Sequence, residues 1–340
     1  MVPSGGDADT VDEADPAESL TRSEVADALA AEDDELLDAV ESALAGRTDL
    51  VAVGVPLSLL PPVLDARHSS AGGTWRIAVR PGVVDVLGRA FALGTAVAEA
   101  VATDGIELRT HASDGGEHGS SRRSSRTLFA TADRVDAVAG PAGNRTLVTQ
   151  CEGASASVAA AVDAVTERFE AATSATVGMP SRNRLLTAAS ERLDDRFADD
   201  LAAVLRALEY GEIGRTGTVT DQALLVALAA RHDHLFYDLR AWVGTETDDG
   251  VGIAPGQELT ADRRALVDRE LIESIKVPMG AGRPNFRLRA VDDALLRAEP
   301  NEVLSVLRGR FALPVDADGE FRRESGRGSR RPVWERNRRR

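Results

Sequence analysis

The chain has 340 residues and a formal net charge of −15. Its single cysteine, Cys151, excludes an intramolecular disulfide and a metal site built from paired cysteines. No apolar run is long enough to cross a bilayer, and the first 20 residues are too acidic and polar for a signal peptide. We therefore expect a soluble, cytoplasmic protein with no membrane partner.

Arginine supplies nearly all of the positive charge, because Lys276 is the only lysine. Together with the excess of acidic residues, this balance is typical of a protein from a salt-rich cytoplasm. There the Debye length falls to about 3 Å, and a highly charged surface keeps the chain soluble. The alternative is an ordinary acidic protein, which the near-absence of lysine makes a poorer description.

Residues 1–20 predict a disordered acidic tail, since they contain almost no large apolar side chains. After it, strand-like and helix-like segments alternate as far as residue 180. Helices are expected over 21–46, 57–67, 83–102 and 157–172. Strands are expected over 49–55, 74–80, 105–111 and 144–149, with β-like segments at 127–132 and 137–139. The alternation predicts an α/β domain over 21–180 with a largely parallel sheet, of the kind that binds effectors.

Residues 181–210 predict one long helix that links this domain to the next. Its apolar residues recur every three or four positions, at Leu186, Ala189, Leu193, Phe197, Leu201, Val204 and Leu208. At 1.5 Å per residue the helix would be roughly 40 Å long. Its apolar stripe either pairs two subunits in a homodimer or packs on the α/β domain of its own chain, and both interpretations stay open here.

Residues 211–315 predict a winged helix-turn-helix. A first helix begins at Asp221, a second spans 235–243, and a loop over 245–257 leads to a third helix that opens at Leu259 with Thr260 as its N-cap. A strand over 271–278, a glycine-rich turn over 279–284 and a strand over 285–289 then form a hairpin. The alternative is a small α+β subdomain that touches no nucleic acid.

The order of these elements predicts a DNA-binding surface. The third helix would enter the major groove, with Thr260 and Arg264 facing out and Arg263 at its flank. An arginine there can read guanine O6 and N7 or bind a phosphate. The candidate residues of the wing are Lys276, Arg283 and Arg287, which we expect to hold the DNA backbone. A dimer would place two such helices about 34 Å apart on a two-fold site.

The run from Leu266 to Phe286 resembles the winged helix of the TbsP family of haloarchaeal transcriptional regulators, and the resemblance extends more loosely over residues 20–315. It implies a sequence-specific regulator of central sugar metabolism whose N-terminal domain senses a metabolite. TrmB-type sugar regulators place their DNA-binding domain first, whereas here it comes last. A TrmB effector site therefore cannot be carried over residue by residue.

A sugar-phosphate effector would bind beyond the carboxyl ends of the strands, where pockets form in open α/β sheets. Arg80, Arg122, Arg123 and Arg126 lie in segments that lead away from those ends, and arginines form charge-assisted hydrogen bonds with phosphates. The alternative is that the arginines at 122–126 belong to a solvated loop.

An enzyme is not expected. The sequence holds no GxSxG, phosphate-binding GxxxxGK[ST] or GxGxxG motif, and its five histidines lack the spacing of a metal site, so no catalytic residue, metal or cofactor is predicted. The basic tail over 316–340 predicts disorder, with nine arginines and two glutamates in its last 20 residues. The alternative to a DNA-binding regulator is a metabolite-binding or protein-interaction module whose winged helix contacts proteins.

Overall fold

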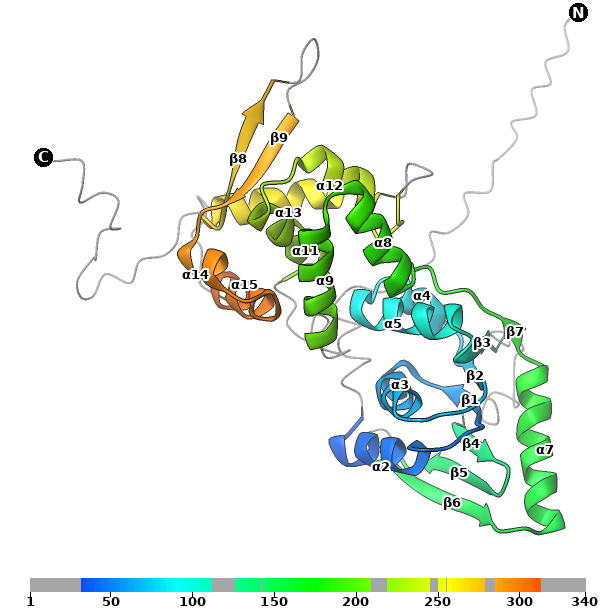
Figure 1. The fold of residues 1–340 in the computed structure, drawn as a ribbon. Helices are drawn as coiled ribbons and strands as arrows, with labels where there is room; N and C mark the ends of the chain where they lie inside the picture. The colour runs from blue at the N-terminus through cyan, green and yellow to red at the C-terminus, as the bar shows by residue number, and fades with distance from the viewer. Residues whose placement is uncertain are drawn as a thin grey trace, which may run out of the picture.

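The computed structural model describes residues 32–111, 126–141, 143–208, 219–244, 250–254, 256–278 and 285–312 (Figure 1). The predicted disordered tails lie outside these residues, as do Arg122, Arg123, Arg283 and the predicted hairpin turn. Within the described ranges, no helix has the length and apolarity needed to cross a membrane.

The first part of the chain is built around one seven-stranded sheet with the strand order β6-β5-β4-β1-β2-β3-β7. Its strands are β1 (Val51–Val55), β2 (Trp75–Val79), β3 (Ile106–Thr110), β4 (Leu128–Thr131), β5 (Arg134–Ala139), β6 (Thr146–Glu152) and β7 (Thr173–Ser174). The strands predicted at 49–55, 74–80, 105–111 and 144–149 are confirmed as β1, β2, β3 and β6.

The expectation of a largely parallel sheet is wrong. Only β1, β2 and β3 run parallel, joined by helical crossovers, whereas β4, β5, β6 and β7 pair antiparallel to their neighbours. The chain passes from β4 to β5 through Ala132 and Asp133 alone, which is too short for a crossover helix and permits only a hairpin. The sheet is therefore mixed.

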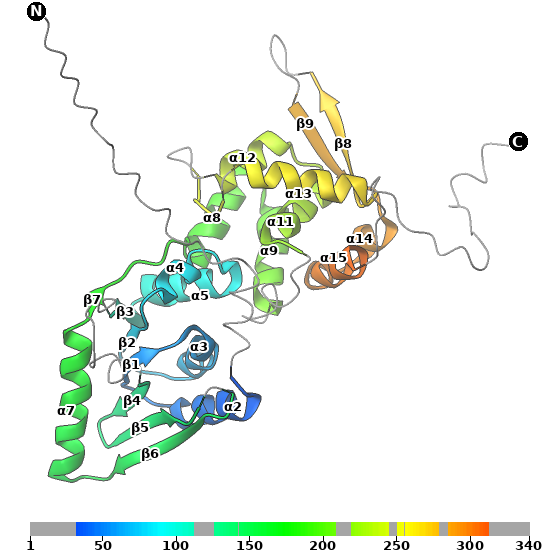
Figure 2. The same ribbon diagram turned by 180° about the vertical axis from the view of Figure 1, so that it is seen from behind.

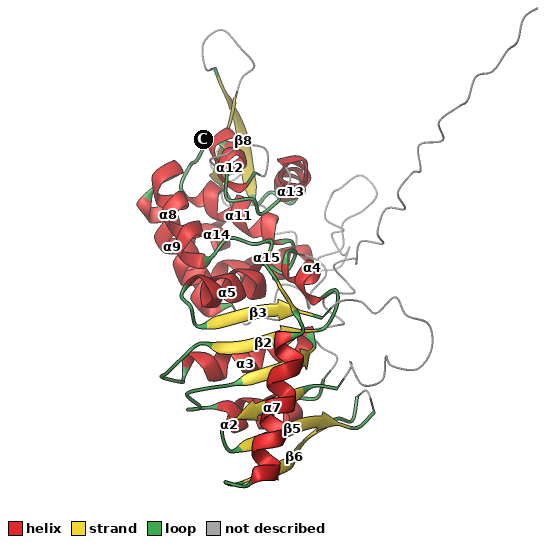
Figure 3. Cartoon of the chain, turned by 90° about the vertical axis from the view of Figure 1, so that its right-hand side faces the viewer, coloured by secondary structure: helices red, strands yellow, loops and turns green. Residues whose placement is uncertain are grey.

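Helices cover both faces of this sheet (Figures 1 and 3). On one face, α7 (Ala156–Glu170) buries Val165 and Phe169 against Val51 and Val53 of β1. On the other face lie α2 (Asp34–Leu44), α3 (Leu60–His68), α4 (Val83–Leu87) and α5 (Phe91–Ala102). The central strand β1 is buried from both sides, which explains its unbroken apolar sequence.

The helix predicted over 83–102 is divided into α4 and α5. Gly94 lies where α5 turns back on the end of α4, and a Cβ added there would sit 2.2 Å from the Leu87 carbonyl oxygen. This close approach requires glycine, and it brings the two helices together around the turn at Gly88 and Arg89.

The helix predicted over 181–210 is likewise two helices, α8 (Arg182–Arg192) and α9 (Asp195–Ala207). The chain turns at Leu193, which has φ −107° and ψ −91°, and the Asp194 carboxylate accepts the Phe197 N–H at 2.8 Å as the N-cap of α9. Phe197 and Leu201 are fully buried in the core of their own chain. This stripe is therefore not exposed for pairing with a second subunit.

The second part of the chain surrounds α11 (Asp221–Arg231), whose residues are buried from Asp221 to Ala230. Seen from behind, α11 lies among the other elements of this region (Figure 2). These are α12 (Phe236–Val243), α13 (Gly256–Asp268), β8 (Ile272–Val277), β9 (Asn285–Ala290), α14 (Asp293–Arg297), the 3-10 turn η2 (Pro300–Glu302) and α15 (Val303–Phe311).

His234 lies at the junction of α11 and α12, packed against α9. Its ring meets the ring of Phe197 edge-on at 5.7 Å, and its Nε2 lies 3.6 Å from the Asp194 carboxylate. Burial lowers the pKa of His234 below its ordinary 6.5, and Asp194 and Asp238 offset the effect only in part, while His232 and Arg196 add to it.

We expect this histidine to make the fold sensitive to acid. Because its pKa is lower in the folded state, the unfolded chain binds the proton more readily, so stability is complete above pH 6.5 and is lost as pH falls through the folded pKa. His234→Asn keeps a neutral polar group and should lose less stability over this range. Urea unfolding at several pH values measures the difference, and equal losses in both proteins would contradict it.

Candidate nucleic-acid interface

The elements of a winged helix-turn-helix come together in the second part of the chain. α12 is followed along the chain by α13, and β8 and β9 pair as the predicted antiparallel hairpin. Leu235, between α11 and α12, forms a bridge to Arg287 of β9, and the Leu288 N–H donates to the His234 carbonyl at 2.9 Å. This bridge adds a one-residue third strand to the wing, too short for a sequence pattern to show.

α13 begins earlier than predicted. It starts at Gly256, so Thr260 is an internal residue and not the N-cap, and its hydroxyl donates to the Gly256 carbonyl at 3.2 Å. Leu259 and Leu266 are both fully buried, seven residues apart on the inner face of the helix. Leu259 is thus part of the packed face of the helix and not the residue that opens it.

Arg264 is exposed on the outer face of α13, beside Ala261 and Asp268. Leu259 and Leu266 point to the opposite side, into the core around α11. A guanidinium that is exposed on a helix of this kind has the reach and the donors to bind a base edge or a phosphate.

Arg263 lies in a different environment from its neighbour. Its guanidinium carbon lies 4.9 Å from the ring centroid of Phe236 and 4.4 Å from that of Phe286, and Nη1 donates to the Ser274 hydroxyl at 2.7 Å. Burial and the nearby charge of Arg264 lower the pKa of Arg263. The side chain joins α12, α13 and both strands of the wing, so its contacts are within the protein.

The wing presents its two described candidates, Lys276 and Arg287, on opposite faces. Both are exposed, but Lys276 pairs with Phe286 and Arg287 pairs with Ile275. Because directly paired residues share a face of a hairpin, the two cations point in opposite directions. One face of the hairpin therefore carries Arg287, and the other face carries Lys276.

Two exposed residues of α12 were not among the predicted contacts. Tyr237 is 59 % exposed, an unusual position for so large a side chain, and Arg240 is exposed one turn later. The helix before a recognition helix crosses the DNA backbone, where a tyrosine hydroxyl can bind a phosphate. An exposed tyrosine in an otherwise amphipathic helix was the available sequence signal.

Of the four residues predicted to bind an effector, Arg80 and Arg126 fall within the described ranges, and Arg80 is already engaged by the protein. Its Nε donates to the Gly54 carbonyl at 3.0 Å and its Nη2 to the Thr127 hydroxyl at 3.2 Å. Burial, followed by the charge of Arg145, lowers the pKa of Arg80. Arg126 is exposed and donates to Gln150 at 3.4 Å.

Sequence reasoning missed an ion pair near Arg80 that joins a half-buried arginine to a buried glutamate. Arg145 donates to the Glu32 carboxylate at 2.6 Å, and the Glu32 side chain is only 3 % exposed. Elsewhere in the described ranges, no group of three or more His, Cys, Asp and Glu side chains is placed to hold a metal ion.

The Arg263 contacts predict a structural role that can be separated from DNA binding. Arg263→Lys removes the planar group between Phe236 and Phe286, and we expect the free energy of unfolding to fall by about 1–2 kcal/mol. The matched change Arg264→Lys, one residue away on the exposed face, should stay within about 0.5 kcal/mol of the unchanged protein. Denaturant unfolding compares the two, and equal effects would refute the structural role.

Two family models match the chain, and together they span nearly all of the described residues. The model described as "Transcriptional regulator TbsP-like, N-terminal" matches residues 27–180, and the model described as "Transcriptional regulator TbsP-like, C-terminal HTH domain" matches residues 181–308. The boundary between them falls immediately before α8. No curated protein and no solved structure matches the chain.

Proposed function

Because the chain belongs to the family of TbsP-like transcriptional regulators, and is thus a DNA-binding regulator, we propose that it controls genes of central sugar metabolism in a halophilic archaeon in response to a metabolite. The observation that carries the DNA-binding part is the exposure of Arg264 on α13 within a winged helix. Family membership also supports a non-enzymatic role.

α13 enters the major groove in this proposal, and Arg264 reads a base edge there. Thr260 lies one turn earlier, where its half-buried hydroxyl supports the start of the contact face. Arg263 acts by holding the wing against α13. It could contact DNA only after leaving Phe236, Phe286 and Ser274, which would require the wing to move. Arg287 and the wing-turn residue Arg283 hold phosphates, and Lys276 serves the opposite face of the hairpin.

The charge of the chain supports a halophilic setting for this binding. A net charge of −15 opposes non-specific attraction to DNA. In concentrated salt, the advantage of releasing counterions from many phosphates is small, so base contacts and shape must supply more of the affinity. A single exposed arginine on the reading helix agrees with that requirement.

The α/β part of the chain is the proposed sensor, which would work in the cytoplasm. A sugar phosphate beyond β1 and β2 would meet Arg80 and Arg126. Arg122 and Arg123 belong to the sequence between β3 and Arg126. Arg145 also lies near Arg80, where it pairs with the Glu32 carboxylate. A homodimer also remains part of the proposal, and it would have to form through a surface other than the buried stripe of α9.

The first test concerns Arg264. On the operator found by a genome-wide footprint, Arg264→Ala should weaken binding by about 1–3 kcal/mol, because a base contact is lost. Binding to random DNA should change less, and the exposed control Arg297→Ala on α14 should change neither. Fluorescence anisotropy measures both. Equal losses of affinity on the two DNAs would assign Arg264 to a phosphate contact. Unchanged affinity on both would contradict the placement of α13 in the major groove.

The second test concerns the wing. Arg287→Ala should weaken binding about equally on all sequences and reduce the slope of log affinity against log salt by about one unit, because one phosphate contact is lost. Lys276→Ala on the opposite face should leave the slope nearly unchanged if the Arg287 face meets DNA. If Lys276→Ala changed the slope and Arg287→Ala did not, the Lys276 face of the hairpin would be the one that meets DNA. If neither change had an effect, the hairpin would lie away from DNA.

A further inference from the structure

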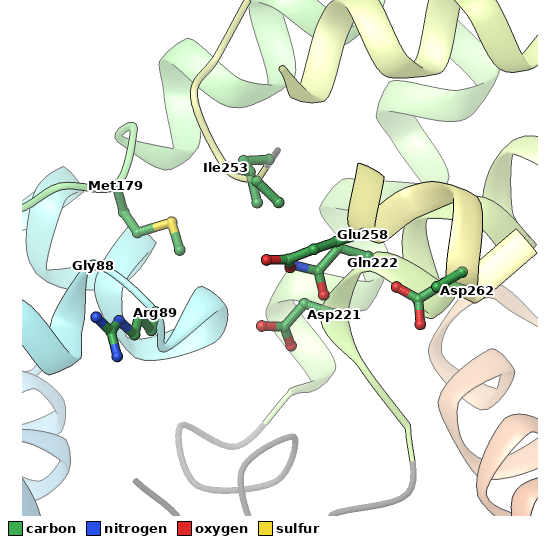
Figure 4. A pocket seen from close by; sticks show the side chains of 10 residues that line it. Gly88, Arg89, Met179, Asp221, Gln222, Ile253, Glu258 and Asp262 are labelled. Atoms are coloured by element: carbon green, nitrogen blue, oxygen red, sulfur yellow. The ribbon is translucent and has the colours of Figure 1, made fainter. Parts of the chain in front are cut away.

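A cavity of about 660 Å³ lies between the two regions that the family models match (Figure 4). Gly88, Arg89 and Met179 belong to the N-terminal region, and the remaining lining residues belong to α11, α13 and the segment before α13. A volume of this size falls within the range of small-molecule sites, which often form where two domains meet.

The two sides of the cavity differ in chemistry. In Figure 4 the carboxylates of Asp221 and Glu258 point from α11 and α13 toward the space in front of Met179. Gln222 lies beside them and donates its amide to Glu258 at 3.1 Å, and Asp262 extends the same side. Met179 and Ile253, both buried to more than nine-tenths, form an apolar boundary with Ala254.

This lining selects for the charge of a ligand. Ionised carboxylates accept hydrogen bonds and cannot donate them, so a molecule in contact with Asp221 and Glu258 must supply the donors. The lining holds three carboxylates, from Asp221, Glu258 and Asp262, against the single cation Arg89. A phosphate or carboxylate on the acidic side would therefore meet an excess of like charge, whereas an ammonium or guanidinium group would be attracted. The apolar boundary suits a hydrocarbon part of the same molecule.

We propose that this cavity binds a small organic cation, with its charged group at Asp221 and Glu258 and its hydrocarbon part against Met179 and Ile253. The site is distinct from the sugar-phosphate region at Arg80 and Arg126, which lies beyond β1 and β2.

The position of the cavity connects the ligand to DNA binding, and in this respect the inference rests on the proposed function. Glu258, Ala261 and Asp262 line the cavity from α13, and Arg264 follows on the same helix. A ligand that contacts both α13 and Met179 favours the arrangement in which the two regions are held together. Such a ligand shifts DNA affinity by the difference in its own affinity for the DNA-bound and free states.

The binding step can be measured without DNA, by calorimetric titration of the full chain with agmatine, which carries a guanidinium and an ammonium on a four-carbon chain. We expect saturable binding that Glu258→Gln weakens by about tenfold, because a charge-assisted hydrogen bond is lost. Ala261→Phe, which fills the cavity from the exposed side of α13, should abolish it.

The matched control is Asp268→Asn, which removes one negative charge from the exposed end of α13, outside the cavity. Binding should be unchanged in this variant, because the removed charge does not contact the ligand. If agmatine were held only by general attraction to an acidic chain, Asp268→Asn and Glu258→Gln would weaken binding alike. Equal losses in the two variants, no agmatine binding, or tighter binding of glucose or glucose 6-phosphate that Ala261→Phe removes would each overturn the proposal. Loss of DNA binding by Arg264→Ala is a separate result, so failure of the two proposals can be distinguished.

Discussion

The burial of α11 is the constraint on which the second part of the structure depends. Nearly every residue of this helix is covered, by α9, α12, α13, α15 and β9. Its alanines, at 223, 227, 229 and 230, let neighbouring helices approach closely, and its leucines fill the spaces that remain. Since one helix contacts both α13 and the wing, the relative placement of the two candidate DNA-contacting elements is set by a single packed core.

The sequence predicted the elements better than their connections. Apolar residues located β1 and β2, and helical periodicity located α7 and α11, because burial imposes those patterns directly. Periodicity could not reveal the break at Leu193, since α8 and α9 both bury apolar residues in the same core and the pattern continues across the turn. Pairing direction was missed because it depends on how short each connection is, which becomes clear only when the strand ends are known.

The sequence predicted which charged residues the candidate site contains, but it did not predict which of their side chains are exposed and which are packed within the protein. Arg263 and Arg264 are adjacent and chemically identical in the sequence, yet aromatic rings enclose one and the other is exposed. The partners of Arg263 lie on three other elements, and no local pattern links them. The acidic cavity was missed for the same reason, because Asp221 and Glu258 resemble ordinary carboxylates of a first helical turn.

The contacts of Arg263 should respond to salt differently from an ion pair. Ion pairs at a surface weaken as dissolved ions accumulate around them, whereas contact between a half-buried guanidinium and two aromatic rings adds dispersion and removal of apolar surface from water to its electrostatic attraction. The contribution from removal of apolar surface is kept or strengthened by salts that are excluded from protein surfaces. Arg263 holds the wing against α13 through Phe236, Phe286 and the neutral Ser274 hydroxyl. These contacts would keep the orientation of the wing in concentrated salt, where an ion pair with a carboxylate would weaken.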